Sequence, residues 1–215
     1  MKIGIFGGTF NPVHFGHLRA AEEIAQNFLD KVIFIPTNIT SNKKMSGIDP
    51  EKRMEMLNTA IKNNKKFEVS DIEIKRGGLS YSYDTIVQLK KIYKSDELYF
   101  IAGIDAYSDV KNWKNGAEIF DKINFIVVNR SGMKSDSKNL VKLISFLPDN
   151  LKERIKVDYS ENRLVTPENK YIYFFKITRL DISSTVIRNN FKNNISNLFL
   201  LPNEVINYII NNKLY

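Results

Sequence analysis

Cysteine is absent from this chain of 215 residues, and histidine and tryptophan are rare. The absence of cysteine excludes disulfide bonds, thiolate metal ligands and cysteine nucleophiles, and it is compatible with the cytoplasm. The sequence also has no apolar run of about 18 residues, the length that a membrane helix needs. It begins with a strand pattern rather than a basic and apolar signal segment, so we expect a cytoplasmic protein that does not enter a membrane.

Two familiar phosphate-binding signatures are missing as well. The glycines at positions 4, 7 and 8 lack the spacing of the Rossmann fingerprint, and no Walker A pattern ending in Gly-Lys-Ser/Thr occurs. The two histidines, without any cysteine, leave a structural zinc site short of ligands. We therefore expect no metal site built from protein side chains.

The chain carries a formal net charge of +8. Its lysine pairs, at 43–44, 65–66 and 90–91, are short and lie among acidic residues, which is typical of a solvated surface. An RNA-binding module is an alternative that salt-dependent binding of RNA would test. The same positive field would favour a small polyanionic substrate.

The order of the apolar patterns indicates an α/β fold in a single domain over residues 1–215. Short apolar runs predict strands at 3–6, 31–35, 98–102, 125–128 and 171–176, and alternation predicts a further strand through 67–69 and 72–74. Apolar residues at helical spacing predict helices that follow positions 17, 50, 85, 184 and 202. The pattern of residues 133–170 is mixed and helical in parts. We expect an open, mostly parallel sheet with helices on both faces and with ligands at the carboxyl ends of its strands.

The stretch from Gly7 to His17, GGTFNPVHFGH, connects the first predicted strand to the first predicted helix. A glycine turn at this place presents backbone N–H groups to an anion. Both histidines of the chain lie here, and on a first helical turn their spacing of three puts them on one face. A solvated pair of histidines is the alternative, but the length and order of the string favour a functional site.

Asp181 to Arg188, DISSTVIR, is a second helix start. Ser183 or Ser184 would cap the helix, and Arg188 follows Ser184 by four residues on the same face. A helix N-terminus with an arginine one turn later can bind pyrophosphate through its dipole, its N–H groups and a forked cation. The alternative is an ordinary capped helix with a surface arginine. The presence of the histidine motif in the same chain favours the pyrophosphate interpretation.

Polar residues also follow the strand at 98–102, where Gly103 and Asp105 precede the only tryptophan, Trp113. Asp105 could hold ribose hydroxyls or cap the next helix. Trp113 could pack in the core or stack on a flat heterocycle. Residues 76–85 form another loop-to-helix junction, for which a structural cap is the simpler interpretation.

These motifs resemble the His-x-Gly-His nucleotidyltransferase superfamily, and their combination resembles the bacterial nicotinate-nucleotide adenylyltransferases. The matching segments are GGTFNPVHFGH at 7–17, SYSYDT at 80–85, AGID at 102–105 with Trp113, RSG at 130–132, ISSTVIR at 182–188 and the C-terminal LP…LY. The resemblance runs almost end to end and in order. At 40–43 the family's Pro-Pro-His-Lys reads Thr-Ser-Asn-Lys, which keeps the lysine, loses the histidine and suggests a floppier loop.

The resemblance implies a Rossmann-like nucleotidyltransferase fold and adenylyl transfer from ATP, accompanied by Mg²⁺, to nicotinate mononucleotide, giving deamido-NAD and pyrophosphate. It implies catalytic roles for His14, His17 and Arg188. The residues implied to bind ATP are Gly7, Gly8, Thr9, Phe10, His14, His17, Gly103, Asp105, Ser183, Ser184, Thr185 and Arg188. Those implied to bind nicotinate mononucleotide are Lys43, Tyr83, Thr85, Trp113 and Arg130.

Other functions remain open from the sequence. The same chemistry could serve nicotinamide mononucleotide, phosphopantetheine, or a sugar or polyol phosphate with CTP. A non-catalytic nucleotide sensor is a different class, although such a protein would be expected to lose a residue such as His14, His17 or Arg188, all of which are present. We expect ATP and nicotinate mononucleotide as partners, neither nucleic acid nor a membrane, and we leave assembly into a homo-oligomer open.

Overall fold

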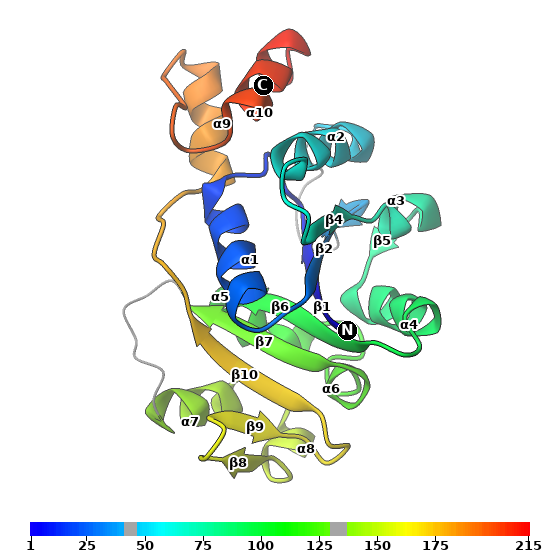
Figure 1. Cartoon of the computed structure of the whole chain (residues 1–215). Coiled ribbons are helices and arrows are strands. Elements are labelled where there is room, and N and C mark those ends of the chain that lie inside the picture. The colour runs from blue at the N-terminus through cyan, green and yellow to red at the C-terminus, as the bar shows by residue number, and fades with distance from the viewer. Residues whose placement is uncertain (41–46, 130–136) are drawn as a thin grey trace. The chain divides into compact units, whose positions relative to one another are not determined.

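The computed structural model describes residues 1–40, 47–129 and 137–215 (Figure 1). The chain divides into two compact units, each of which is built from two separate pieces. Unit 1 consists of Met1–Phe6 and Tyr81–Thr178, and unit 2 consists of Gly7–Ser80 and Arg179–Tyr215. This division does not decide whether the chain is one domain, so the single domain over residues 1–215 stays a prediction.

Unit 1 contains strands in the order β1-β6-β7-β10-β9-β8. Their bounds are Lys2–Gly8 for β1, Glu97–Gly103 for β6, Asn124–Asn129 for β7, Lys156–Asp158 for β8, Arg163–Val165 for β9 and Tyr171–Lys176 for β10. Neighbours among β1, β6, β7 and β10 pair in parallel, whereas β9 pairs antiparallel with both β10 and β8. The last two residues of β1, Gly7 and Gly8, belong to unit 2.

The parallel strands of unit 1 are continuous apolar runs because they are buried along their length. Ile5, Phe125 and Ile126 are 0% exposed, and Ile101 is 1% exposed. The helices of this unit are α4 Ser82–Ile92, α5 Ile104–Ser108, the 3₁₀ turn η1 Val110–Asn112, α6 Ile119–Lys122, α7 Ser137–Ser145 and α8 Asp149–Lys152. The regular alternation of such strands with helices confirms the predicted α/β class.

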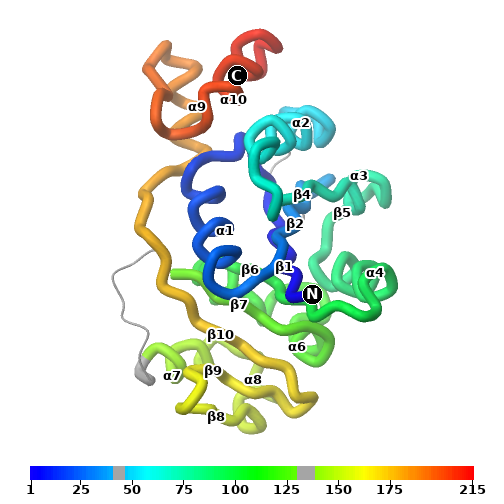
Figure 2. Tube along the Cα trace, viewed as in Figure 1, coloured from blue at the N-terminus to red at the C-terminus, as the bar shows by residue number. Residues whose placement is uncertain are grey.

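Unit 2 contains the helices that carry both predicted motifs. Its elements are α1 Phe15–Asn27, β2 Lys31–Pro36, β3 Ile39–Thr40, α2 Pro50–Ile61, β4 Phe67–Val69, α3 Ile72–Arg76, β5 Leu79–Ser80, α9 Ser184–Lys192 and α10 Asn203–Asn211. The pairs β2–β4 and β3–β5 are parallel. The helix α10, drawn in red, packs against α2 (Figure 2).

One local prediction was wrong, and one pair of strands was missed. Residues 72–74 were expected to be a strand, but they begin the helix α3, which ends before Gly77 at φ +71°. Three residues fit the strand periodicity as well as the helix periodicity. A glycine in the left-handed region after two basic residues is a stronger signal, because it is typical of a helix C-terminus. Within 133–170 the antiparallel pair β8–β9 was missed, because strands of three residues are too short to show alternation.

Among the helices of the described ranges, none combines the length and the apolar character needed to cross a membrane.

Candidate active site

The two histidines lie at the start of α1, in unit 2. His14 is the N-cap residue, and His17 is in the first turn. The backbone N–H of His14 donates to Nδ1 of His17 at 3.3 Å, and the two rings stack with their centroids 3.7 Å apart. Because Nδ1 of His17 is an acceptor, the neutral ring carries its proton on Nε2. His17 can therefore donate a hydrogen bond to a ligand from Nε2.

Phe10 is a second aromatic residue that contacts the His17 ring. Its backbone has φ +47°, its side chain is 1% exposed, and its ring meets that of His17 edge-on at 5.1 Å. A Cβ atom on Gly8 would lie 2.9 Å from the Phe10 ring, so this ring requires glycine at position 8. The side chain of Phe10 thus contacts protein, and only its backbone is available to ATP.

The second predicted motif folds against the first. The Ser184 hydroxyl donates to the carbonyl oxygen of Pro12 at 2.9 Å, and Nη1 of Arg188 donates to that of Asn11 at 2.7 Å. Nη2 of Arg188 also donates to Oγ1 of Thr185 at 3.2 Å. These bonds join residues 172 and 177 positions apart in the sequence, so the structure brings the two motifs together.

The charge distribution at these two helix starts favours an anion. Ser183 is the N-cap of α9 and accepts a hydrogen bond from the backbone N–H of Thr185 at 3.2 Å. Neither α1 nor α9 has an acidic residue in its first turn. The positive ends of both helix dipoles are therefore not neutralised locally, and the guanidinium of Arg188 adds a full positive charge.

Arg53 of α2 is a residue of this site that the sequence interpretation missed. It is 2% exposed and donates to four carbonyl oxygens: those of Thr9 at 2.8 Å, Thr37 at 2.6 Å, Asn38 at 3.0 Å and Ile48 at 3.4 Å. Burial lowers the pKa of Arg53 from its ordinary value. Its position three residues before Met56, on the buried face of α2, was a signal that could have identified it.

Tyr215 holds the other side of the motif loop. Its hydroxyl donates to Oδ1 of Asn11 at 2.5 Å, and its ring stacks on Phe191 of α9 at 5.8 Å. Burial raises the pKa of the Tyr215 phenol, which stays protonated and can act as this donor. Asn11 thus receives hydrogen bonds from Tyr215 on its side chain and from Arg188 on its backbone.

In unit 1, the residues after β6 form a second group of predicted ligands. Gly103 is the N-cap of α5, and Asp105 is exposed in the first turn of that helix. Trp113 follows η1, is half-buried, and meets Phe100 edge-on at 5.8 Å. The backbone N–H of Gly116 donates to the Trp113 carbonyl at 3.0 Å and closes the turn that holds the indole.

The start of α4 contains Tyr83 and Thr85, two of the residues predicted to bind nicotinate mononucleotide. Thr85 is 2% exposed, and its hydroxyl and its backbone N–H both donate to the Tyr81 carbonyl at 3.2 Å. The Tyr83 hydroxyl donates to Oε2 of Glu118 at 3.1 Å. A ligand bond from the Thr85 hydroxyl would require it to leave Tyr81. The first turn of α4 also carries Asp84, whose carboxylate pairs with Lys114 at 2.8 Å, so that its charge opposes an anion less strongly.

Lys43 and Arg130 lie outside the described residues, so their predicted roles stay predictions. Across the ranges that the structure describes, no three histidine, aspartate or glutamate side chains are grouped so that they could hold a metal ion.

Comparisons with known proteins show the family of this chain. The family described as cytidylyltransferase-like matches residues 5–190. A protein of Geotalea daltonii named probable nicotinate-nucleotide adenylyltransferase is 40% identical over 217 residues, with 100% of this chain and 98% of the relative covered. A protein of Carboxydothermus hydrogenoformans with the same name is 39% identical, again with 100% and 98% covered.

Solved structures agree on the fold. A structure described as Plasmodium falciparum nicotinic acid mononucleotide adenylyltransferase complexed with NaAD has a TM-score of 0.74 and 21% identity, and covers 100% of this chain and 97% of its own. A second structure of that protein, complexed with APC, has a TM-score of 0.73 and 21% identity and covers 100% and 96%. These similarities confirm the predicted Rossmann-like nucleotidyltransferase fold.

Proposed function

Because this chain belongs to the cytidylyltransferase-like family and to the nicotinate-nucleotide adenylyltransferases, we propose that it transfers the adenylyl group of ATP to nicotinate mononucleotide. The products are deamido-NAD and pyrophosphate, which is a step of NAD biosynthesis. The observation that carries the proposal is the contact between the motif of His14 and His17 and the motif of Arg188 in unit 2.

The nucleophile is the phosphate of the mononucleotide. Its oxygen attacks the α-phosphorus of ATP in line, a P–O bond forms, and the bond to the leaving pyrophosphate breaks. An ionised phosphate needs no general base, so the protein has to supply positioning and charge stabilisation. This requirement suits a group of fixed hydrogen-bond donors, such as the one that unit 2 contains.

The donors of unit 2 stabilise the charge that develops on the phosphates. Nε2 of His17 donates to the α-phosphate, and His14, stacked on its ring, takes part in the same contact. Arg188, Ser184 and Thr185, at the start of α9, hold the β- and γ-phosphates. The backbone from Gly7 to Phe10 lies along the triphosphate. Arg53 and Tyr215 position this loop through Thr9 and Asn11.

ATP enters as its magnesium complex, in which the phosphates and water supply most of the ligands. An ion carried by the substrate needs no group of three protein side chains. Gly103 and Asp105 bind the ribose of ATP: the glycine allows close approach, and the exposed carboxylate accepts from hydroxyl groups.

Nicotinate mononucleotide binds through its ring and its carboxylate. Trp113, whose indole is half-buried, stacks on the pyridine ring. The carboxylate lies at the N-terminal turn of α4, close to Tyr83 and Thr85. Lys43 and Arg130 supply positive charge to the phosphate of the mononucleotide.

The proposal is tested by following both products. The protein, Mg-ATP and nicotinate mononucleotide should yield deamido-NAD, identified by mass spectrometry, and an equal amount of pyrophosphate. With ATP that is chiral at a thio-substituted α-phosphorus, direct in-line attack predicts inversion of configuration. Retention would indicate a covalent enzyme intermediate and contradict the mechanism, and the absence of both products would contradict the function.

A further inference from the structure

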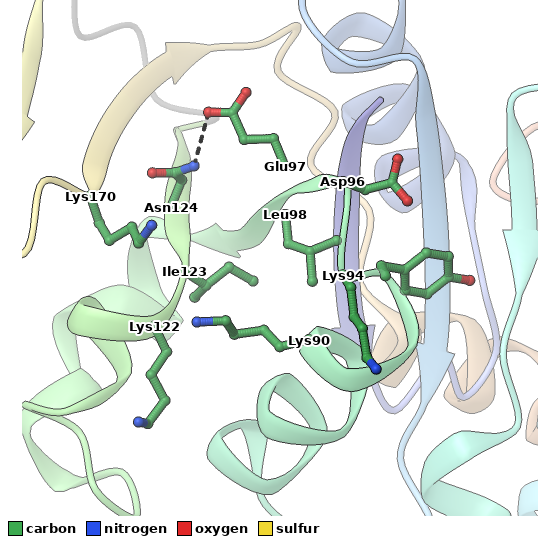
Figure 3. A pocket seen from close by; sticks show the side chains of 10 residues that line it. Lys90, Lys94, Asp96, Glu97, Leu98, Lys122, Ile123, Asn124 and Lys170 are labelled. Atoms are coloured by element: carbon green, nitrogen blue, oxygen red, sulfur yellow. Dashed lines mark hydrogen bonds between the residues drawn. The ribbon is translucent and has the colours of Figure 1, made fainter.

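A pocket of about 120 Å³ lies in unit 1 at the amino ends of its parallel strands (Figure 3). Its lining includes Leu98 of β6, Ile123 and Asn124 at the start of β7, and Lys170 directly before β10. Lys90 in the last turn of α4, Lys94 in the turn after this helix and Lys122 of α6 complete a group of four lysines in the lining. Four lysine side chains contribute to the lining, and the two whose ammonium groups point inward, Lys90 and Lys170, make this pocket a candidate anion site.

The two carboxylates of the lining are already engaged. Oδ1 of Asp96 pairs with the α-amino group of Met1 at 2.8 Å, and Oε1 of Glu97 accepts from the amide of Asn124 at 3.4 Å. In Figure 3 the Glu97 carboxylate points toward Asn124, while the ammonium groups of Lys90 and Lys170 point toward the middle of the pocket. Across the described ranges, neither of these two lysines forms an ion pair with a carboxylate.

The positive charges repel one another in a partly apolar surrounding. The pKa of Lys90 is lowered first by burial and then by the charges of Lys170 and Lys122. Leu98 and Ile123, which contribute to the lining, are 7% and 2% exposed. Such a surface strengthens the attraction between an ammonium group and an anion, and a bound anion would relieve the repulsion.

We propose that this pocket is a second anion site, which binds a small multiply charged anion of the phosphate class between Lys90 and Lys170. It is separate from the unit 1 residues that we assign to the substrates. Those residues follow the carboxyl end of β6 at Gly103, whereas the pocket lies at Glu97 and Leu98. The seven residues of β6 span roughly 20 Å at about 3.3 Å each.

The volume of the pocket limits the size of the anion that it can bind. A volume of about 120 Å³ is well below the roughly 300–1,000 Å³ of pockets that enclose small organic molecules. It accommodates a small phosphate anion but does not enclose a whole nucleotide. Inorganic phosphate and pyrophosphate share the required chemistry, and pyrophosphate is also a product of the proposed reaction.

The test is residue-specific. The backbone amide signals of Leu98 and Asn124 are followed by nuclear magnetic resonance while the protein is titrated with inorganic phosphate or, separately, with pyrophosphate. Sodium chloride at matched ionic strength serves as the blank. We expect a saturable shift of these signals with at least one of the two anions. The anion with the lower dissociation constant identifies the source of the phosphate group.

The variants separate a built site from general surface charge. Lys90→Gln and Lys170→Gln should each weaken binding, and the double variant should weaken it at least about tenfold, because each change removes a charge-assisted contact. Lys91→Gln is the matched control, since Lys91 is exposed on the same helix and does not line the pocket. Lys90 is itself exposed, so its single variant remains informative if the double variant fails to fold.

Three outcomes would overturn the proposal. The signals of Leu98 and Asn124 could stay unmoved by both anions, chloride could move them equally, or Lys91→Gln could weaken binding as much as Lys90→Gln. None of these results depends on adenylyl transfer, so the pocket and the proposed function can fail independently.

Discussion

At the scale of single residues, His17 is held by two contacts. Its Nδ1 accepts the backbone N–H of His14, and its ring meets that of Phe10 edge-on at 5.1 Å. A donor that is fixed in this way needs no reorganisation when charge develops on a phosphate. The orientation of Nε2 is therefore a consequence of how α1 begins.

His17→Ala should lower kcat by at least about 100-fold, the scale expected when one transition-state donor is lost. The KM values should change less, because binding of ATP also uses Arg188 and the backbone. Steady-state kinetics with Mg-ATP and nicotinate mononucleotide measure both quantities. Gln26→Ala, on the exposed face of the same helix, is the control. Near-normal turnover of a folded His17→Ala protein would remove the assigned role.

Trp113→Ala should raise the KM for nicotinate mononucleotide more than the KM for ATP, because the indole stacks on the pyridine ring. Trp113→Phe keeps an aromatic face and should recover much of the loss. The two KM values are measured by varying one substrate at a saturating concentration of the other. If the KM for ATP rose more, Trp113 would belong to a different contact.

Single residues also show what the sequence can predict. His14, His17 and Arg188 could be identified because their signal is local: a residue type at helical spacing beside a turn or a cap. The position of Arg53 on the apolar face of α2 indicates burial, but the roles of Arg53 and Tyr215 could not be predicted, because they arise from contacts with Thr9 and Asn11 that only the folded chain creates.

At the scale of elements, α2 is attached to the motif loop through Arg53. This side chain donates to carbonyl oxygens of the segments after β1 and after β2. The sequence predicted α2 from its capping pattern and its apolar face, but residues 72–74 were assigned to the wrong element. Capping and periodicity are local signals in long elements, whereas in three residues they are ambiguous.

Arg53→Met should lower the free energy of unfolding by about 2–4 kcal/mol, because it leaves buried carbonyl oxygens without donors. It should also lower kcat, since Thr9 loses its support. Arg53→Lys should have intermediate stability and an intermediate kcat, because an ammonium group cannot reproduce the forked donors of the guanidinium. Chemical denaturation and kinetics are measured together, with Lys52→Met as the control. A fully stable and active Arg53→Met protein would contradict the positioning role.

Gly116→Ala should disturb the turn that carries Trp113. A Cβ atom at this position would lie 2.2 Å from the Val110 carbonyl oxygen and 3.2 Å from that of Trp113. The backbone must move, so we expect a loss of stability of about 1–3 kcal/mol and a raised KM for nicotinate mononucleotide. Gly47→Ala is the control, since a Cβ there meets nothing within 4 Å. Equal behaviour of the two variants would show that the turn tolerates the change.

At the scale of the whole molecule, several tyrosines make stability depend on alkaline pH. Burial raises the pKa of Tyr99, Tyr107 and Tyr215, and burial together with the hydrogen bond to Glu55 raises that of Tyr208 to about 12. These phenols stay protonated in the folded protein where the unfolded chain has already lost the proton. Their contribution to the free energy of unfolding is complete below about pH 10, and it is lost as the pH rises through their pKa values in the folded protein.

The free energy of unfolding, measured by chemical denaturation, should therefore fall between about pH 10 and 12. Tyr107→Phe should make the free energy of unfolding fall less steeply with pH in this range. Its hydroxyl is buried and has no hydrogen-bond partner among the described residues, so its removal should leave stability at neutral pH unchanged or higher. A stability that is constant across this range in the wild-type protein would contradict the assigned burial.

The central claim is adenylyl transfer to a pyridine mononucleotide, and pyrophosphate release tests it most directly. The rate with Mg-ATP is compared for nicotinate mononucleotide and nicotinamide mononucleotide at equal concentrations. We predict rapid release with the acid and much slower release with the amide, because the start of α4, where Lys114 pairs with Asp84 at 2.8 Å, favours a carboxylate over a neutral amide. Preference for the amide would contradict the assigned carboxylate site, and release with neither substrate would contradict the proposed function.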